Sequence, residues 1–565
     1  MTTKIPTVIP AQAARALTAA GATLTAVSAF LPWTWSSEFP GDLTYYGSPA
    51  GLQWVAFIAG LLTLLYTLAS YGVRGTGWAA PTGANQALRL LGIGTLAGSW
   101  FAVGAIGWQL GGLANLDPGG WVLAVGALIA AVGALQLPDD HRAAPAPAKL
   151  SSWAEISVIA AVLAVGLAAF AFGIGAEAES FTGYLITVVF AIAAINKAGL
   201  PARLSALTAK HRTVTTAGAF AAAAAFPFTQ SNDLYVLIGV NILIFATVAL
   251  GLNVVVGLAG LLDLGYVAFL GVGAYAAALV SGSPFSVFRD FHVPFPVAAL
   301  IGALAALVFG VVIGAPTLRL RGDYLAIVTL GFGEIFRITM NNLDGNSGPS
   351  LTNGPNGIAA IPDVSMFGFD FGKPHVIGGL EISKFTNYLL LMLLVTAIVV
   401  TVFGRVADSR IGRAWVAIRE DETAAEAMGI NGFRVKLIAF ALGATLAGLA
   451  GAVQAHTQSA VSPEGYLFAG PVAPNSAFLL AAVILGGMGT ISGPLLGASL
   501  LFLIPAKLEF LKDYQLLTFG IALILLMRFR PEGIVANRRQ KLEFHEADIP
   551  AQGTPTDTAL SKAGA

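Results

Sequence analysis

Long apolar runs recur along the whole chain, and they restrict its fold more than any other feature. An α-helix needs about 20 consecutive apolar residues to cross the hydrocarbon core of a bilayer, and most of these runs hold about 17 to 23. Lipid offers the backbone no hydrogen-bond partners, so only helices and closed barrels span it. A barrel would show strands of about ten residues with alternating polarity, whereas these runs are uninterrupted. The sequence therefore predicts an all-α polytopic membrane protein.

The apolar runs predict about sixteen transmembrane helices. They cover residues 14–32, 51–71, 90–110, 120–137, 153–174, 183–197, 213–228, 235–257, 262–280, 295–316, 324–340, 387–404, 434–456, 474–488, 493–509 and 514–529. With the N-terminus in the cytoplasm, 24 of the 30 Lys and Arg residues fall on the cytoplasmic side, which agrees with the positive-inside rule. Arg337 lies within a run, and five basic residues fall outside: Arg289, Lys373, Lys384, Lys507 and Lys512. We therefore expect a multi-pass protein with both termini in the cytoplasm.

The segment "NKAGLPARLSALTAKHR", residues 196–212, carries four basic residues before a new apolar run. We expect it to divide the chain into an N-terminal accessory membrane region of about six spans, residues 1–212, and a core of about ten spans, residues 213–540. The polar end of the chain, residues 541–565, is predicted to be a disordered cytoplasmic tail.

The stretch "GRAWVAIREDETAAEAMGI", residues 412–430, differs in composition from the rest of the chain. Only 11% of all residues are charged, yet five charges fall here within ten residues: Arg413, Arg419, Glu420, Asp421 and Glu422. Ile411, Trp415 and Ile418 recur at helical spacing, which predicts a cationic helix with one apolar stripe.

A second helix is predicted directly after the first. Asp421 or Glu422 stands where an N-cap or first-turn acid belongs, and Gly429 suits the left-handed position that ends a helix. The residues between them are mostly small, so another surface can approach the backbone closely. In an arbitrary membrane protein, a solvated amphipathic loop would be the simpler interpretation.

The sequence contains no recognisable catalytic motif. Searches for the phosphate-binding G-x-x-x-x-G-K-[ST], the metal-binding H-E-x-x-H and the nucleophile G-x-S-x-G patterns find nothing. The chain has no cysteine, which excludes thiol chemistry, and its net charge of zero gives no indication of a nucleic-acid partner. We therefore expect no enzyme activity and no cofactor in this chain, so any ATP hydrolysis that drives it must occur in a separate polypeptide.

The charged stretch resembles the cytoplasmic coupling loop of permease subunits from branched-chain amino-acid ABC importers. Four longer blocks resemble the signatures of the same family in the same order, at residues 250–279, 318–337, 351–358 and 481–498. The resemblance covers about residues 213–540, and residues 1–212 depart from the family pattern.

In ABC importers the coupling loop carries a Glu-Ala-Ala pattern followed, after three residues, by Gly, and it inserts into a cleft of the ATPase subunit. The resemblance places this pattern at Thr423, Ala424, Ala425 and Gly429, with threonine in the acidic position. The expected ATPase-coupling residues, within a coupling loop at residues 405–433, are Arg413, Arg419, Glu420, Asp421, Glu422, Ala424, Ala425 and Gly429.

Two further pairs are candidates for the translocation path. Glu334 and Arg337 are ionisable residues of one predicted span, and their spacing places them on one helix face, where they either line the path or form a structural ion pair. Gly486 and Gly487 belong to "ILGGMGTISGP", where glycine allows either close helix packing or a helix break that lines the path.

The resemblance implies a subunit that translocates branched-chain amino acids by alternating access in a bacterial plasma (inner) membrane. Its implied partners are the lipid bilayer, a homologous second permease, ABC ATPase subunits that use ATP and Mg²⁺, and an extracytoplasmic solute-binding protein received near the external loop, residues 341–387. A urea or short-amide importer shares much of this signature. The alternatives of other classes are a non-transporting scaffold and an ion-coupled secondary transporter, which would normally carry several intramembrane carboxylates.

Overall fold

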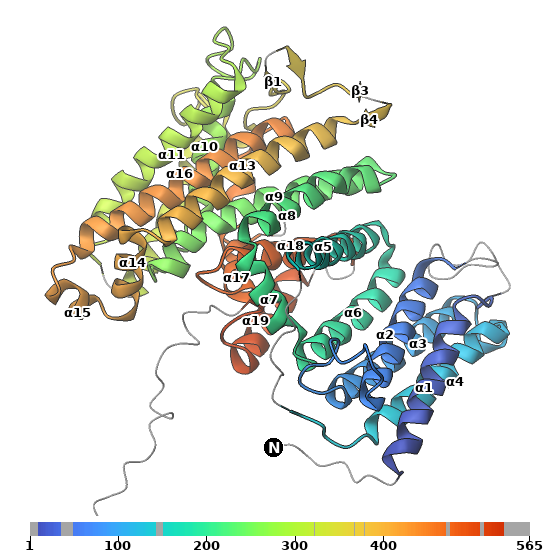
Figure 1. Cartoon of the computed structure of the whole chain (residues 1–565). Coiled ribbons are helices and arrows are strands. Elements are labelled where there is room, and N and C mark those ends of the chain that lie inside the picture. Colours follow the sequence, from blue (N-terminus) through green and yellow to red (C-terminus); the bar gives the residue numbers. More distant parts are fainter. Residues whose placement is uncertain are drawn as a thin grey trace, which may run out of the picture. The chain divides into compact units, whose positions relative to one another are not determined.

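The computed structural model describes residues 9–34, 49–142, 151–320, 323–366, 368–377, 379–470, 475–508 and 514–535. The described residues are predominantly helical, from α1 to α19, with two short hairpins (Figure 1). The chain folds into two compact units, Met1–Ile238 with Pro505–Phe510 and Gly239–Ile504 with Leu511–Ala565. The predicted tail, residues 541–565, lies outside the described residues.

The first unit is built from helices that follow the apolar runs. They are α1 (Ala11–Ser28), α2 (Gly51–Tyr71), α3 (Asn85–Gln109), α4 (Pro118–Leu135), α5 (Ser152–Gly175), α6 (Ala178–Lys197), α7 (Leu200–Lys210) and α8 (Arg212–Ala225), with the 3₁₀ turns η1 (Leu113–Asn115) and η2 (Phe226–Thr229). Small residues bring α1 and α4 together, because a Cβ at Gly133 would lie 2.7 Å from the Thr18 nitrogen and 2.8 Å from the Ala14 carbonyl oxygen. Close backbone approach of this kind favours helix association in lipid.

The second unit contains the longer helices and the two hairpins. Its helices are α9 (Asp233–Asn253), which begins in the residue range of the first unit, α10 (Val267–Leu279), α11 (Phe295–Thr317), α12 (Asp323–Asn342), α13 (Lys384–Ala407), α14 (Arg410–Glu420), α15 (Glu422–Ala427), α16 (Gly432–Gln458), α17 (Ser476–Gly486), α18 (Ser492–Lys507), which ends in the range of the first unit, and α19 (Gln515–Phe529). Short helical turns are the π-helical η3 (Val254–Leu258) and the 3₁₀ turns η4 (Gly354–Asn356) and η5 (Pro463–Tyr466).

Three helices of the second unit meet at glycines. A Cβ at Gly448 of α16 would lie 2.8 Å from the Gly302 carbonyl oxygen of α11, and a Cβ at Gly302 would lie 2.7 Å from the Gly273 carbonyl oxygen of α10. Gly273 in turn lies directly against the backbone of Gly448. The backbones of α10, α11 and α16 are therefore in mutual contact at these three glycines, where a larger residue would not fit.

Each of the sixteen predicted segments contains a helix, and the prediction of an all-α polytopic membrane protein is confirmed, whereas the number of sixteen spans stays a prediction. Within the described residues, nine helices are long and apolar enough to cross a membrane, and four further apolar helices are shorter. One of these is α10, which has 13 residues where the apolar run covers 262–280. A helix of that length rises only about 20 Å and cannot by itself cross a hydrocarbon core of about 30 Å.

The segment between α12 and α13 carries the hairpins. Strands β1 (Ser365–Met366) and β2 (Phe369–Asp370) pair antiparallel, with Ser365 opposite Asp370. Strands β3 (His375–Ile377) and β4 (Leu380–Ile382) form the second antiparallel pair. Figure 1 shows these hairpins at one end of α13 and α16, and α14 and α15 at the opposite end.

Candidate functional site

The charged stretch forms two helices whose first member is fixed to the body of the second unit. Ser409 caps α14, because its Oγ accepts a hydrogen bond of 3.2 Å from the Gly412 nitrogen. Trp415 is fully buried, and its Nε1 donates to the Val435 carbonyl oxygen of α16 at 2.7 Å. Ile418 is also buried, whereas Ile411 remains 39% exposed. The predicted apolar stripe is therefore confirmed at Trp415 and Ile418, whereas Ile411 does not join the buried side.

The break between the helices and the end of α15 follow from local capping. Asp421 is extended, and its Oδ1 accepts a hydrogen bond of 2.9 Å from the Ala424 nitrogen, as an N-cap residue does. At the other end Gly429 has a φ of 87°; its nitrogen donates to the Glu426 carbonyl, and the Ile430 nitrogen donates to the Ala425 carbonyl. These two bonds form a Schellman motif. The predicted order of helix, break and second helix is confirmed.

Three of the predicted coupling charges hold the pair in place. Arg419 points inward, with Nη1 donating to the Gly257 carbonyl oxygen of η3 at 2.9 Å and Nη2 donating to Glu420 at 2.6 Å. Glu422 accepts a hydrogen bond of 2.6 Å from Nζ of Lys436, whose side chain is only 6% exposed. Arg419 and Glu422 therefore determine how the two helices sit on the protein, and no local pattern in the sequence indicates their partners Gly257 and Lys436.

The outer face of α15 is open and mostly uncharged. Ala424 and Gly429 are exposed, as the pattern predicted, but Ala425 is buried and lies on the inner face. Met428, which the sequence reasoning missed, is 84% exposed and stands next to Gly429. The available signal for Met428 was its position on the same helix face as Ala424, four residues away. The exposed residues of α15 and its C-cap, here called the α15 face, are Thr423, Ala424, Glu426, Ala427, Met428 and Gly429.

Glu334 and Arg337 form the ion pair that their spacing predicted. Nε of Arg337 lies 3.0 Å from Oε1 of Glu334 on the same helix, α12. The Arg337 Nη1 atom also lies 3.3 Å from Oε1 of Glu464 in η5, a partner that the sequence analysis missed. This second contact links α12 to the turn that follows α16.

Gly486 and Gly487 lie at a helix break, as one of the two predictions stated. Helix α17 ends at Gly486, Gly487 has a φ of 120°, and α18 begins at Ser492. The Gly486 carbonyl accepts a hydrogen bond of 2.9 Å from the Val535 nitrogen, so the segment that follows α19 covers this side of the break.

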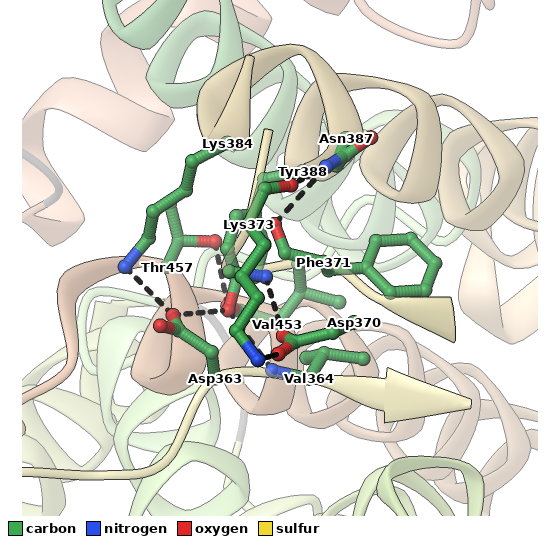
Figure 2. Close-up of polar contacts among 11 residues, drawn as sticks. Asp363, Val364, Asp370, Phe371, Lys373, Lys384, Asn387, Tyr388, Val453 and Thr457 are labelled. Atoms are coloured by element: carbon green, nitrogen blue, oxygen red, sulfur yellow. Dashed lines mark hydrogen bonds and ion pairs between the residues drawn. The ribbon is translucent and has the colours of Figure 1, made fainter. Parts of the chain in front are cut away.

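The external loop is fixed to the first turns of α13 (Figure 2). Asp363 accepts hydrogen bonds from Nζ of Lys384 at 2.7 Å and from the Tyr388 hydroxyl at 2.9 Å. The Val364 nitrogen donates to the same hydroxyl at 3.1 Å. Asn387 donates to the carbonyl oxygens of residues 371 and 373, so several contacts hold the loop against one helix end.

The Lys373 ammonium stabilises a turn of this loop. Its Nζ lies 3.0 Å from Oδ2 of Asp370, at the end of β2. The side-chain hydrogen bond from Lys373 and the backbone bond from Gly372 hold the pKa of the Asp370 carboxyl below its ordinary value. The turn therefore keeps its ion pair at any pH above that lowered pKa.

Comparison with known proteins supports the resemblance found in the sequence. A family model described as "Branched-chain amino acid transport system / permease component" matches residues 234–527. The high-affinity branched-chain amino acid transport system permease protein LivM of Salmonella typhimurium is 40% identical over 336 residues, which cover 57% of this chain and 74% of that protein. LivM of Escherichia coli matches to the same extent.

A second type of permease shows a weaker similarity. The permease protein LivH of Escherichia coli is 25% identical over 299 residues, covering 52% of this chain and 91% of that protein. No solved structure matches the chain. The matched region contains the helix pair α14–α15 and both candidate path pairs, and the family model leaves the first 233 residues unmatched. The chain therefore belongs to the family of permease components of branched-chain amino acid transport systems.

Proposed function

We propose that this chain translocates branched-chain amino acids through a bacterial inner membrane by alternating access, driven by separate ATPase subunits. Membership of the permease family supports the transport role, and the names of the LivM relatives support the substrate class. The similarity to LivH, a second permease type, supports assembly with a homologous second permease. ATP and Mg²⁺ would be bound by the ATPase subunits. In this topology about sixteen helices enter or cross the bilayer and both termini are cytoplasmic.

The α15 face is the proposed contact with the ATPase subunit. Small side chains such as Ala424 allow a partner to approach the α15 backbone, and Met428 offers a flexible apolar side chain that adapts to a cleft. The acidic contacts are Glu420, Asp421 and Glu426, which are exposed, while Arg413 adds a cation on the neighbouring helix. The inner side of the helix pair holds this face in position, through Arg419, Glu422 and Ala425.

The other predicted sites fit the same scheme. We propose that Glu334 and Arg337 lie along the translocation path, where their link to Glu464 couples α12 to η5. Gly486 and Gly487 contribute the break itself, because the φ of Gly487 ends α17 and the Gly486 carbonyl is held by the Val535 nitrogen. The external loop, fixed on α13, offers an ordered surface to a solute-binding protein. Residues 1–212 form an accessory membrane region, and residues 213–540 form the permease core.

A matched pair of substitutions tests the proposed ATPase contact. Ala424→Arg places a bulky cation on the α15 face, and Ala206→Arg makes the same change at an exposed alanine of α7. Arginine and alanine have similar helix propensities, so neither change should unfold its helix. The importer is reconstituted in vesicles with its permease, ATPase and binding-protein partners, and ATP-dependent uptake of labelled leucine and of labelled urea is measured.

We expect Ala424→Arg to abolish leucine uptake and ATPase co-purification, while Ala206→Arg keeps both. Uptake of urea and not of leucine would show that the chain transports urea instead of branched-chain amino acids. Uptake that requires no ATPase would show an ion-coupled transporter instead. Equal effects of the two substitutions would contradict the role of the α15 face.

A further inference from the structure

Asn253, the last residue of α9, binds a helix break far away in the sequence. Its side chain is fully buried. The amide Nδ2 donates to the Thr490 carbonyl oxygen at 2.7 Å, and the amide Oδ1 accepts from the Gly489 nitrogen at 2.8 Å. Both polar atoms of one side chain are therefore used by the backbone between α17 and α18. A side-chain amide paired in this way replaces the hydrogen bonds that the interrupted helix has lost.

The π-helical turn η3 brings Asn253 and the break together. A Cβ at Gly257 would lie 2.6 Å from the Gly489 nitrogen and would collide with the Asn253 amide oxygen. Gly489 has a φ of 75°, a conformation that favours glycine. Glycines on both sides thus permit the contact between η3 and the break. Single π-helical turns are rare and are found frequently at functional sites.

The same turn, η3, is bound from the other side by α14. The Gly257 carbonyl oxygen accepts the hydrogen bond of 2.9 Å from Nη1 of Arg419, the last but one residue of α14. Gly260, with a φ of 72°, leaves room for this arginine, because a Cβ there would lie 2.5 Å from Cγ of Arg419. The Gly257 carbonyl therefore binds Arg419, and the Gly257 α-carbon packs against the break between α17 and α18.

We infer that Arg419, Gly257 and Asn253 form a relay through which the position of α14 sets the conformation of the break between α17 and α18. The inference rests on the proposed docking of the α14–α15 pair to an ATPase. Movement of α14 pulls on the Gly257 carbonyl, η3 shifts with it, and the Asn253 amide moves the backbone at 489 and 490. Asn253 is a positioning residue in this scheme, since its amide acts on the break and need not touch the transported molecule.

The alternative is that Asn253 only stabilises the fold, and a coupling ratio separates the two roles. In the reconstituted importer, leucine uptake and ATP hydrolysis are measured together for Asn253→Ala, Arg419→Gln and the double variant. We expect Asn253→Ala to keep ATP hydrolysis and to lower the leucine transported per ATP about tenfold, the effect of losing a buried hydrogen-bonded pair. The double variant should be no worse than the more affected single variant, because both changes interrupt one relay.

Proportional loss of uptake and hydrolysis in Asn253→Ala, or additive losses in the double variant, would overturn the relay. A second measurement covers the case in which Asn253→Ala fails to fold. The natural chain has no cysteine, so Ser492→Cys, at the exposed start of α18, gives a single thiol whose labelling rate reports on the break. Trapping the ATPase subunits with bound ATP should change the labelling rate of this thiol when Arg419 is present. The labelling rate should stay unchanged in the Arg419→Gln background. The same change in both backgrounds would refute the relay.

The relay and the proposed function fail in different ways. A natural importer without ATP-driven leucine uptake would overturn the proposed function. The relay alone would be overturned by three results together: the natural importer takes up leucine normally, Ala424→Arg abolishes this uptake, and Asn253→Ala leaves the leucine transported per ATP unchanged.

Discussion

The pair Glu422–Lys436 should respond unequally to loss of either partner. The two side chains lie 2.6 Å apart, but the Lys436 side chain is 6% exposed and that of Glu422 is 29% exposed. Glu422→Gln leaves a buried ammonium without a counter-charge, and we expect a loss of about 3 kcal/mol, the lower end for a broken buried pair. Lys436→Met leaves a carboxylate that water can reach, so its cost should be about 1 kcal/mol.

The double variant Glu422→Gln/Lys436→Met should be close to Lys436→Met alone, because it leaves no buried charge unpaired. Thermal unfolding of the purified proteins in detergent ranks the three variants by their stability. Lys373→Met is the matched control, since its exposed pair with Asp370 on the external loop should contribute less than about 1 kcal/mol. Equal losses from the two single changes, or a larger loss from Lys436→Met, would refute the reasoning.

Two further predictions concern the C-cap of α15 and the base of the external loop. Gly429→Ala should destabilise the helix pair by about 1 kcal/mol through its positive φ, because an added Cβ meets nothing within 4 Å. An unchanged midpoint of thermal unfolding would contradict this expectation. Tyr388→Phe removes the hydroxyl that joins Asp363 to the Val364 nitrogen, so limited proteolysis should cleave the external loop several-fold faster. An unchanged rate would show that the contacts of Lys384 and Asn387 are enough to fix the loop.

The parts of the site that depend on local chemistry could be predicted from the sequence. The α14–α15 pair follows from the spacing of Trp415 and Ile418, the N-cap at Asp421 and the glycine at 429, all within a few residues of one another. The ion pair between Glu334 and Arg337 follows from positions three apart on one helix. Each of these features is decided by neighbours along the chain.

The parts that depend on distant neighbours could not be predicted in this way. The direction of Arg419 is set by a carbonyl 162 positions away, and the pairing of Asn253 with the break spans 236 and 237 positions. Neither contact leaves a periodic pattern. The short length of α10 could not be predicted either, because leucine and glycine in residues 262–266 belong to an apolar run whether they lie in a helix or in the loop before it.

The glycine contact among α10, α11 and α16 has a mechanical consequence for alternating access. Sliding one helix past another normally proceeds by small rearrangements of the side chains between them, but at Gly273, Gly302 and Gly448 backbone atoms touch directly and the nearest side chains are the methyl groups of Ala306 and Ala452. These three helices should therefore move as one rigid block. We therefore expect the hinges of the transport cycle to lie outside this block, at η3 and at the break between α17 and α18, where the regular helical hydrogen bonds are already interrupted.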